Sequence, residues 1–147
     1  AVGPVLRASG VAQDLRQTGY EACGELGFEP IVETDGDCYA RAVVRAREVY
    51  QAIDLALEAL HRLPEGEAQV KVKGNPNGET IRRVEQPRGE VLWYVKGNGT
   101  KNLVRMRVRT PTYAHIPALL KMLPGCEMAD VPVVTLSIDP CISCTER

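Results

Sequence analysis

A helical repeat of apolar side chains is the feature that most constrains the fold of this chain. Between residues 38 and 63 the apolar positions recur in steps of three and four, which marks one face of an α-helix. This stripe consists of Val43, Ala46, Tyr50, Ile53, Leu57 and Leu60. Such a stripe usually packs in the protein core, and we predict that burial for it.

Both ends of this helix carry recognisable signals. Asp37 is suited to cap its first turn, while Pro64 and Gly66 stop it, so we predict a long helix over 38–64. The charged side chains fall largely off the apolar stripe. We therefore expect solvent contact for three of them, Arg41, Arg45 and Arg47.

Short apolar runs after this helix predict a small antiparallel sheet. The strand candidates are Ala68–Lys73, Val91–Lys96 and Leu103–Val108, and the last two flank a hairpin turn at Gly97–Thr100. The residues of Gly74–Gly89 are mostly polar and are expected to form a connection. The sheet is thus predicted within 68–108.

The rest of the chain is divided by turn residues. Glycines and prolines punctuate residues 1–37, which we interpret as a loop-rich segment with one short helix over Val11–Arg16. A second, shorter helix is predicted over Tyr113–Leu123, within a region 112–147 that ends in a tail. The predicted fold class is α+β, with both helices packed on the small sheet in one domain.

Charge and cysteine content exclude several classes of protein. A net charge of −1 over 147 residues gives no bulk attraction to nucleic acid. No apolar run approaches the roughly 20 residues that span a bilayer. Five cysteines are an odd number, which argues against a closed disulfide framework and favours a reducing compartment.

Cys141 and Cys144 form a Cys-x-x-Cys pair, for which three kinds of site are open. A thioredoxin-like pair needs a helix after the motif, and only three residues follow here. A structural zinc site needs two more ligands. Cys23, Cys38, Cys126, His61 and His115 are the candidates for these ligands. The third kind is a nickel or iron site that another segment completes.

The tail sequence DPCISCTER resembles the second metal-binding motif of [NiFe] hydrogenase large subunits, Asp-Pro-Cys-x-x-Cys-x-x-His/Arg. The resemblance implies that Cys141 is a terminal nickel ligand and that Cys144 bridges nickel to iron. It also implies a nickel–iron centre whose iron carries cyanide and carbon monoxide. Maturation in that family cuts after the basic residue of the motif, which is the position of Arg147 here.

Further segments resemble the energy-converting branch of these hydrogenases, which includes the formate-hydrogenlyase enzymes. The segments are GPVLRASGVAQDLR, DGDCYARAVVRAREVYQAI, PRGEVLWYV and RMRVRTPTYAHI. The 49-kDa subunit of respiratory complex I has the same order but lacks the metal cysteines. The resemblance therefore implies reversible hydrogen evolution and oxidation, coupled to ferredoxin-type electron transfer.

Two interior pairs resemble family segments that line the metal pocket. Pro87 and Arg88 match the segment beside the cyanide ligands, and a guanidinium is a permanent cation with several directed donors. Pro111 and Thr112 match the segment whose hydroxyl donates to the other cyanide. On residue type alone, Arg88 is a surface turn residue and Thr112 a helix N-cap.

The family's other cysteine motif, Arg-x-Cys-Gly-x-Cys, is absent from the chain. Only half of the thiolate ligands are then present, so we expect the chain to be an excised piece of a longer subunit, inactive alone. The implied partners are the N-terminal half of the large subunit and an iron–sulfur small subunit, with membrane-arm subunits reached indirectly. The expected location is the cytoplasm, peripheral on the inner face of the cell membrane.

Two other functions compete with the hydrogenase interpretation. Cys141 and Cys144 would serve a non-catalytic, zinc-stabilised interaction module, or remain as relics in a complex I-like quinone oxidoreductase subunit. In the isolated chain the two thiols would be free or would hold adventitious zinc.

Overall fold

The computed structural model describes residues 1–146. Helices and strands follow in the order α1 (Gly3–Arg7), the 3₁₀-helix η1 (Leu15–Thr18), α2 (Cys38–His61), β1 (Asn77–Gln86), β2 (Gly89–Asn98), β3 (Arg105–Arg109), α3 (Pro111–Met122), α4 (Val131–Ser137) and α5 (Ile142–Thr145). The strands form one antiparallel sheet in the order β1-β2-β3. The predicted α+β class is confirmed. None of the helices in this part of the chain is long and apolar enough to cross a membrane.

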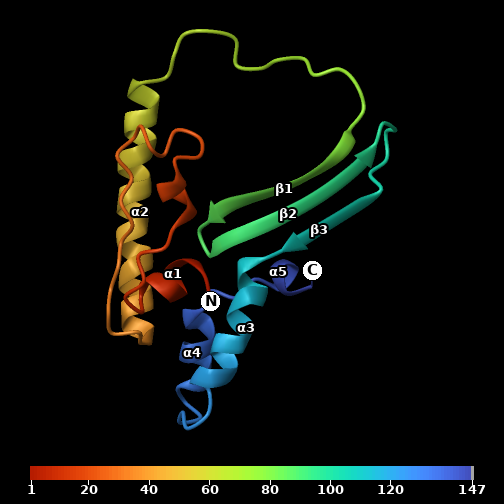
Figure 1. Ribbon diagram of the computed structural model, residues 1–147. Helices are drawn as coiled ribbons and strands as arrows, with labels where there is room; N and C mark the ends of the chain where they lie inside the picture. The colour runs from red at the N-terminus through yellow and green to blue at the C-terminus, as the bar shows by residue number, and fades with distance from the viewer. Residues whose placement is uncertain (147) are drawn as a thin grey trace.

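The long helix α2 begins where the sequence predicts. The Asp37 carboxylate accepts the backbone N–H of Ala40 at 2.7 Å, which satisfies a donor in the first turn. Its first turns pack on α1, where Ala8, Ala40 and Val44 form a small buried cluster. In Figure 1, α2 stands along one side of the molecule and the sheet extends away from it.

The apolar stripe of α2 is largely exposed, so the prediction that it lies in the core is wrong for this chain. Tyr50, Ile53, Leu57 and Leu60 are 73%, 52%, 52% and 67% exposed. The residues that α2 buries are Ala40, Arg41 and Val44, all in its N-terminal half. The described residues therefore leave most of an apolar helix face without a cover.

Arg41 is buried, which corrects the prediction that it contacts solvent. Its Nη1 donates to the Gly36 carbonyl oxygen at 2.7 Å, and its Nε donates to the Ser137 hydroxyl at 2.9 Å. The guanidinium thus ties the start of α2 to the end of α4. Arg45 is half-buried, whereas Arg47 is exposed as predicted.

The sheet differs from the prediction at its first strand. Residues 68–73 form no strand, and β1 lies within the segment expected to be a connection. It pairs with β2 along its whole length, from Asn77 opposite Asn98 to Gln86 opposite Gly89. Two residues, Pro87 and Arg88, make the turn between these strands. The predicted strands at 91–96 and 103–108 are confirmed in β2 and, with a shift of bounds, in β3.

The β2–β3 connection covers residues 99–104, two positions later than predicted, because Gly97 and Asn98 still belong to β2 and β3 begins at Arg105. The β1–β2 turn lies against the start of α1, where Gly3 and Gly89 approach each other closely. A Cβ on Gly3 would lie 2.4 Å from the Gly89 Cα, and both residues have positive φ, 60° and 124°. Only glycine fits both positions, so the start of α1 is held against the β1–β2 turn.

The remaining helices are shorter than α2. In place of the predicted helix over 11–16, the N-terminal segment contains α1 and η1. The predicted helix over 113–123 is confirmed as α3, which begins two residues earlier at Pro111. A proline suits the first turn of a helix because its missing N–H has no helical partner there. The apolar stretch before the tail forms α4.

Candidate metal centre in the C-terminal tail

The two tail cysteines flank the start of the short helix α5. Cys141 is its N-cap residue and Cys144 lies in its only turn, where the Cys144 N–H donates to the Cys141 carbonyl oxygen at 3.1 Å. Both side chains are partly exposed. This turn places the two thiols on neighbouring positions of one short, accessible segment.

Two threonines at the start of α3 hold this segment. The Thr112 hydroxyl oxygen accepts the Cys141 N–H at 3.3 Å, and the Thr110 hydroxyl donates to the Cys144 carbonyl oxygen. Thr110 and Thr112 are both buried. Figure 1 shows α5 beside α3, close to the end of β3. The position of the cysteine pair is thus fixed by buried side chains of another element.

The two thiols differ in their readiness to ionise. A contact of 3.2 Å with the Ser143 hydroxyl is the main cause that lowers the pKa of Cys141 from 9.0 to about 7. Burial, followed by the neighbouring Cys141, raises the pKa of Cys144. Because the thiolate is the form that binds metals and attacks electrophiles, Cys141 is the more reactive member of the pair.

Arg88 lies in the β1–β2 turn and reaches the residues just before the cysteines. Its Nε donates to the Asp139 carbonyl oxygen at 3.1 Å and lies 3.3 Å from the Asp139 carboxylate. Its own carbonyl oxygen accepts from Nε2 of the fully buried His115 at 3.0 Å. Burial lowers the pKa of His115, which keeps its ring neutral. Arg88 is therefore a turn residue that also contacts the tail.

The other predicted pocket residues are placed unequally around the tail. Pro111 and Thr112 are buried at the start of α3, whereas Pro87 is exposed in the turn. Thr110, not Thr112, occupies the N-cap position of α3, so the capping interpretation of Thr112 is wrong. Its hydroxyl contacts the backbone of Cys141 instead.

The sequence did not predict a contact for Thr110, nor a role for the Asp139 side chain, which appeared only as part of the tail motif; His115, a candidate zinc ligand, instead holds the Arg88 carbonyl oxygen. Asp139 has a positive φ of 54°, an uncommon conformation for a residue with a side chain. It directly precedes Pro140 and aims the chain toward Cys141. The Asp-Pro step and the threonine before Pro111 were the signals in the sequence for these residues.

The tail brings together only two candidate metal ligands. Within 1–146 no three His, Cys, Asp or Glu side chains are grouped so that they could hold a metal ion. The chemistry of the pair still fits a soft metal, because two thiols, one with a lowered pKa, stand within one helical turn. A metal site with three or more such ligands would need donors from outside residues 1–146.

The difference between the thiols predicts a pH-dependent alkylation of the metal-free chain. Cys141 is expected to react with iodoacetamide faster than Cys144, with a rate that rises as the pH passes about 7. Replacing Ser143 with alanine should move this rise to higher pH. Mass spectrometry of the two labelled cysteines over a pH series measures both rates, and equal rates with a common midpoint would contradict the assignment.

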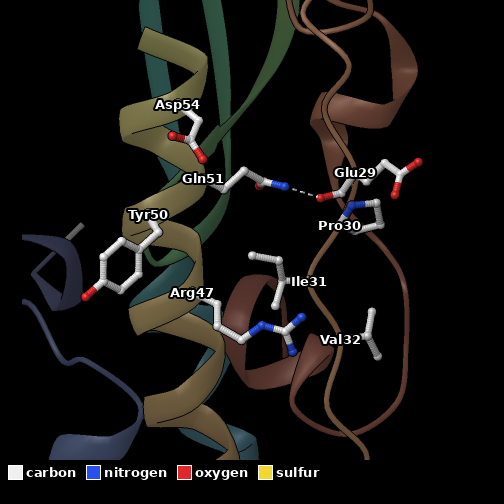
Figure 2. A pocket seen from close by; sticks show the side chains of 8 residues that line it. All are labelled: Glu29, Pro30, Ile31, Val32, Arg47, Tyr50, Gln51 and Asp54. Atoms are coloured by element: carbon white, nitrogen blue, oxygen red, sulfur yellow. Dashed lines mark hydrogen bonds between the residues drawn. The ribbon is translucent and has the colours of Figure 1, made fainter. Parts of the chain in front are cut away.

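A separate groove of about 660 Å³ lies between α2 and the segment 29–32, lined in part by Arg47, Tyr50 and Asp54. Figure 2 shows Gln51 reaching across it, where its amide donates to the Glu29 carbonyl oxygen at 2.6 Å. None of the predicted site residues lines this groove. Its lining contains no thiol and adds nothing to the candidate metal centre.

The comparisons with known proteins agree on one family. The family model "Respiratory-chain NADH dehydrogenase, 49 Kd subunit" matches residues 1–75 and 69–147. The membrane-bound sulfane sulfur reductase, described as an archaeal respiratory membrane complex, contains a chain with a TM-score of 0.89 and 33% identity. The match covers all of the present chain and 42% of that one.

Curated relatives include both hydrogenases and quinone oxidoreductases. The carbon monoxide-induced hydrogenase of Rhodospirillum rubrum is 42% identical over 99% of the chain and 41% of its own length. The alpha subunit of the membrane-bound hydrogenase of Pyrococcus furiosus is 39% identical, with 100% and 39% covered. One of the NADH-quinone oxidoreductase subunits of Dehalococcoides mccartyi is 38% identical, with 95% and 39% covered.

The chain thus spans about two fifths of the length of these relatives, and they are subunits of oxidoreductase complexes. The predicted resemblance to energy-converting hydrogenases and to the complex I subunit is confirmed by the matches along the whole sequence. The chain belongs to the family of the 49-kDa subunit of respiratory-chain NADH dehydrogenase.

Proposed function

We propose that this chain is part of the catalytic large subunit of a membrane-associated [NiFe] hydrogenase, which evolves or oxidises hydrogen with ferredoxin-type electron transfer. The observation that carries the proposal is the cysteine pair itself. Cys141 and Cys144 stand on one turn of α5, held there by Thr110 and Thr112. A hydrogenase of this kind needs a pair of metal-binding thiols, whereas a quinone-reducing relative does not need them.

In this proposal Cys141 and Cys144 are the ligands that the chain contributes to a nickel–iron centre. That centre, when bound, supplies the site where protons and electrons combine to form hydrogen. Thr112 holds the backbone of Cys141 through the hydrogen bond of 3.3 Å from the Cys141 N–H to its hydroxyl oxygen. Thr110 holds the backbone of Cys144 through the hydrogen bond from its hydroxyl to the Cys144 carbonyl oxygen. Both contacts order the backbone of the cysteine pair before a metal binds, which reduces the ordering that metal binding requires.

Arg88 is proposed to place a permanent positive charge beside the metal centre and its anionic cyanide ligands. Its Nε is directed at Asp139, two residues before Cys141, and its side chain is 36% exposed. Buried His115 accounts for part of this position, since it holds the Arg88 carbonyl oxygen. Pro87 and Pro111 shape the two backbone segments around that contact, at the turn and at the start of α3.

Two further thiolates are proposed to come from the rest of the large subunit. The chain would need these ligands for activity. Electrons would pass to an iron–sulfur small subunit, and contact with the membrane would come through further partner subunits. The relatives named as hydrogenases include one described as membrane-bound. The chain spans about two fifths of them, which leaves room for the missing ligands.

The second candidate function is a complex I-like quinone oxidoreductase subunit. Relatives named as NADH-quinone oxidoreductase subunits favour it, at 38% identity over 95% of the chain. This candidate gives Cys141 and Cys144 no metal to bind. A structural zinc site within the chain is less well supported, because residues 1–146 bring no third ligand to the pair.

Purified intact complex decides between these functions. The hydrogenase proposal predicts nickel and iron in the complex and hydrogen evolution from a reduced low-potential carrier. Quinone reduction by a nickel-free complex would support the second candidate and contradict the first. Zinc bound to Cys141 and Cys144, with unfolding of the chain by a chelator, would support the structural site.

The exposed apolar face of α2 is proposed as the surface that the rest of the large subunit covers. Ile53 and Leu57 are each 52% exposed, while Leu60 is 67% exposed. Completing the burial of such side chains is worth about 1 kcal/mol each, since full burial gives about 1.5–3 kcal/mol. The chain spans only about two fifths of its relatives, so a covering segment of the same subunit is available.

Replacing Leu57 with aspartate in the intact subunit is expected to prevent assembly of the complex. A carboxylate in an apolar interface costs several kcal/mol, which corresponds to more than about a 100-fold loss in association. Size-exclusion chromatography of the tagged complex measures the loss. Leu57→Met is the matched control and should assemble normally, while normal assembly of Leu57→Asp would contradict the proposed interface.

A further inference from the structure

A fully buried arginine lies at the meeting point of three carboxylates. Arg7, at the end of α1, has a side chain with no exposed surface. Its guanidinium nitrogens lie 2.8 Å from the Asp14 carboxylate, 2.7 Å from Glu48 on α2 and 3.1 Å from Glu85 on β1. Three segments that are distant in sequence, residues 7–14, α2 and β1, therefore meet at one charge cluster.

The cluster contains more negative than positive groups. Arg16 adds a second guanidinium, but its bonds of 2.9 and 2.7 Å go to Asp14. Glu48 lies at 4.0 Å from Arg16, whereas the ion pair of Glu85 is with Arg7. With every group ionised, three carboxylates would face two guanidiniums. Asp14 is the best paired of the three, so the surplus charge falls on Glu48 and Glu85.

Other charged and titratable groups around the pair do not remove this surplus. Glu90 is the partner of Glu85 in the neighbouring strand β2 and lies on the same face of the sheet, but it is already paired with Arg83 and Arg109. The Tyr20 hydroxyl accepts a hydrogen bond from the backbone N–H of Glu85. This contact involves the main chain of Glu85 and not its carboxylate. On α2, Arg45 lines the same cavity as Glu48 and donates to the Arg41 carbonyl oxygen, and no ion pair joins it to Glu48 within residues 1–146. Its charge is offset first by the Asp139 carboxylate, which lines the same cavity.

A cavity gives the two glutamates access to water. Its volume is about 400 Å³, and Glu48 and Glu85 both line it although their side chains are only 11% and 4% exposed. The lining also includes Pro87, which precedes Arg88, and Asp139, which is two residues before Cys141. The cavity therefore extends from the charge cluster to the segments beside the tail.

We propose that Glu48 and Glu85 form a buried proton-binding site, which holds one proton in excess of the salt bridges and exchanges it with water in this cavity. One bound proton leaves two carboxylates facing two guanidiniums, which balances the cluster. A metal cation is a poorer occupant, because the Arg7 guanidinium already stands between the carboxylates and would repel it.

Burial supports this assignment. Desolvation is the largest cause that raises the pKa of Glu48, and it likewise raises the pKa of Glu85, with nearby Asp14 as the second cause for Glu85. Removal of water disfavours the charged form of a carboxyl, so a proton is retained at higher pH than on an exposed glutamate. The nearby guanidiniums act in the opposite direction and stabilise the anion once the proton leaves.

The exchange step is a simple proton transfer. A carboxyl oxygen of the pair gives its proton to a water molecule in the cavity, which becomes hydronium, and the carboxylate that remains keeps its bonds to Arg7. The reverse step restores the carboxyl, and no electron moves. Use of this site to supply protons for hydrogen evolution rests on the proposed function, whereas the existence of the site does not.

Infrared titration of the intact complex tests the site directly. The spectrum should contain a protonated-carboxyl band, sensitive to exchange into D₂O, that titrates above the ordinary glutamate pKa of about 4.3. Glu85→Gln and Glu48→Gln should each remove or shift this band. Glu79→Gln changes an exposed glutamate on the same strand and should leave it unchanged.

A variant outside the glutamate pair keeps the proposal testable if the glutamine variants do not assemble. Arg16→Gln removes a partly exposed cation near the cluster and should move the titration of the band to higher pH. Arg82→Gln, an exposed arginine on the other face of β1, should not move it. Absence of any such band in the unmodified complex, or the same band and titration in both glutamine variants, would overturn the proposal.

A kinetic measurement separates this inference from the proposed function. If the complex evolves hydrogen, Glu85→Gln should slow evolution by about 100-fold, the low end for a positioned proton-transfer group, with its nickel content unchanged. Unchanged evolution with the band removed would overturn the relay role and leave the binding site established. A complex that evolves no hydrogen would overturn the proposed function alone, because the infrared titration still decides the site.

Discussion

Replacing Cys141 with serine is expected to reduce hydrogen turnover by the intact complex by more than about 100-fold. Changes outside the ligand shell of a metal already cost about 10–100-fold in affinity or activity, and loss of a ligand should cost more. A serine hydroxyl remains protonated at neutral pH and is a poor ligand for a soft metal. Hydrogen evolution per assembled complex measures the effect.

Two controls make this result specific to the tail. Cys144→Ser should cause a loss of similar size, because both thiols stand on the same turn of α5. Cys126→Ser changes a half-buried cysteine outside the tail, whose thiol contacts the Met122 carbonyl oxygen, and should keep full activity. Full activity in either tail variant would contradict the ligand assignment.

Replacing Arg7 with methionine is expected to lower the free energy of unfolding by about 3–5 kcal/mol. Removal of one partner from a buried ionic cluster leaves the remaining charges uncompensated in a medium of low dielectric. Asp14, Glu48 and Glu85 would all lose the guanidinium that they share. Urea unfolding at neutral pH measures the change.

The pH dependence of this defect follows from the sign of the charges. Without Arg7 the three carboxylates repel one another, and burial already raises the pKa of Glu48 and Glu85. Protonation relieves the repulsion, so the destabilisation should shrink as the pH falls. Arg62→Gln, at an exposed ion pair on α2, should cost at most about 0.5 kcal/mol. A defect of that small size in Arg7→Met would contradict the account of the cluster.

The elements that the sequence predicts well are those with local signals. The α2 helix begins after the Asp37 cap, and α3 ends at Met122, two residues before Pro124, a residue that cannot continue a helix. Both depend on periodicity and capping chemistry within a few residues. In contrast, β1 was missed because its residues alternate poorly and are mostly exposed. Its structure comes from pairing with β2, a contact that no local pattern encodes.

The periodicity of α2 correctly predicted an apolar face, but it contains no information on which part of the protein covers that face. Tyr50 and Leu57 are exposed, whereas Arg41 is buried through bonds to Gly36 and Ser137. Its charge alone predicted that Arg41 contacts solvent, and only the tertiary contacts show that it is buried. The Arg7 cluster likewise depends on tertiary contacts, because its carboxylates come from distant segments.

The candidate site was predictable as far as it follows a compact motif. Cys141 and Cys144 lie together because only two residues separate them, and Arg88 does contact the tail segment at Asp139. The roles of Thr110 and Thr112 needed the fold, since both act through the backbone of residues about 30 positions away. Spacing in the sequence gives no information on such contacts.

Nickel and iron analysis of the intact complex tests the central claim most directly. The unmodified complex should contain both metals, and the Cys141→Ser complex should assemble with little or no nickel. This outcome would assign the tail thiol to the metal centre. Nickel retained in full by the Cys141→Ser complex, or a complex that never contains nickel, would contradict the account.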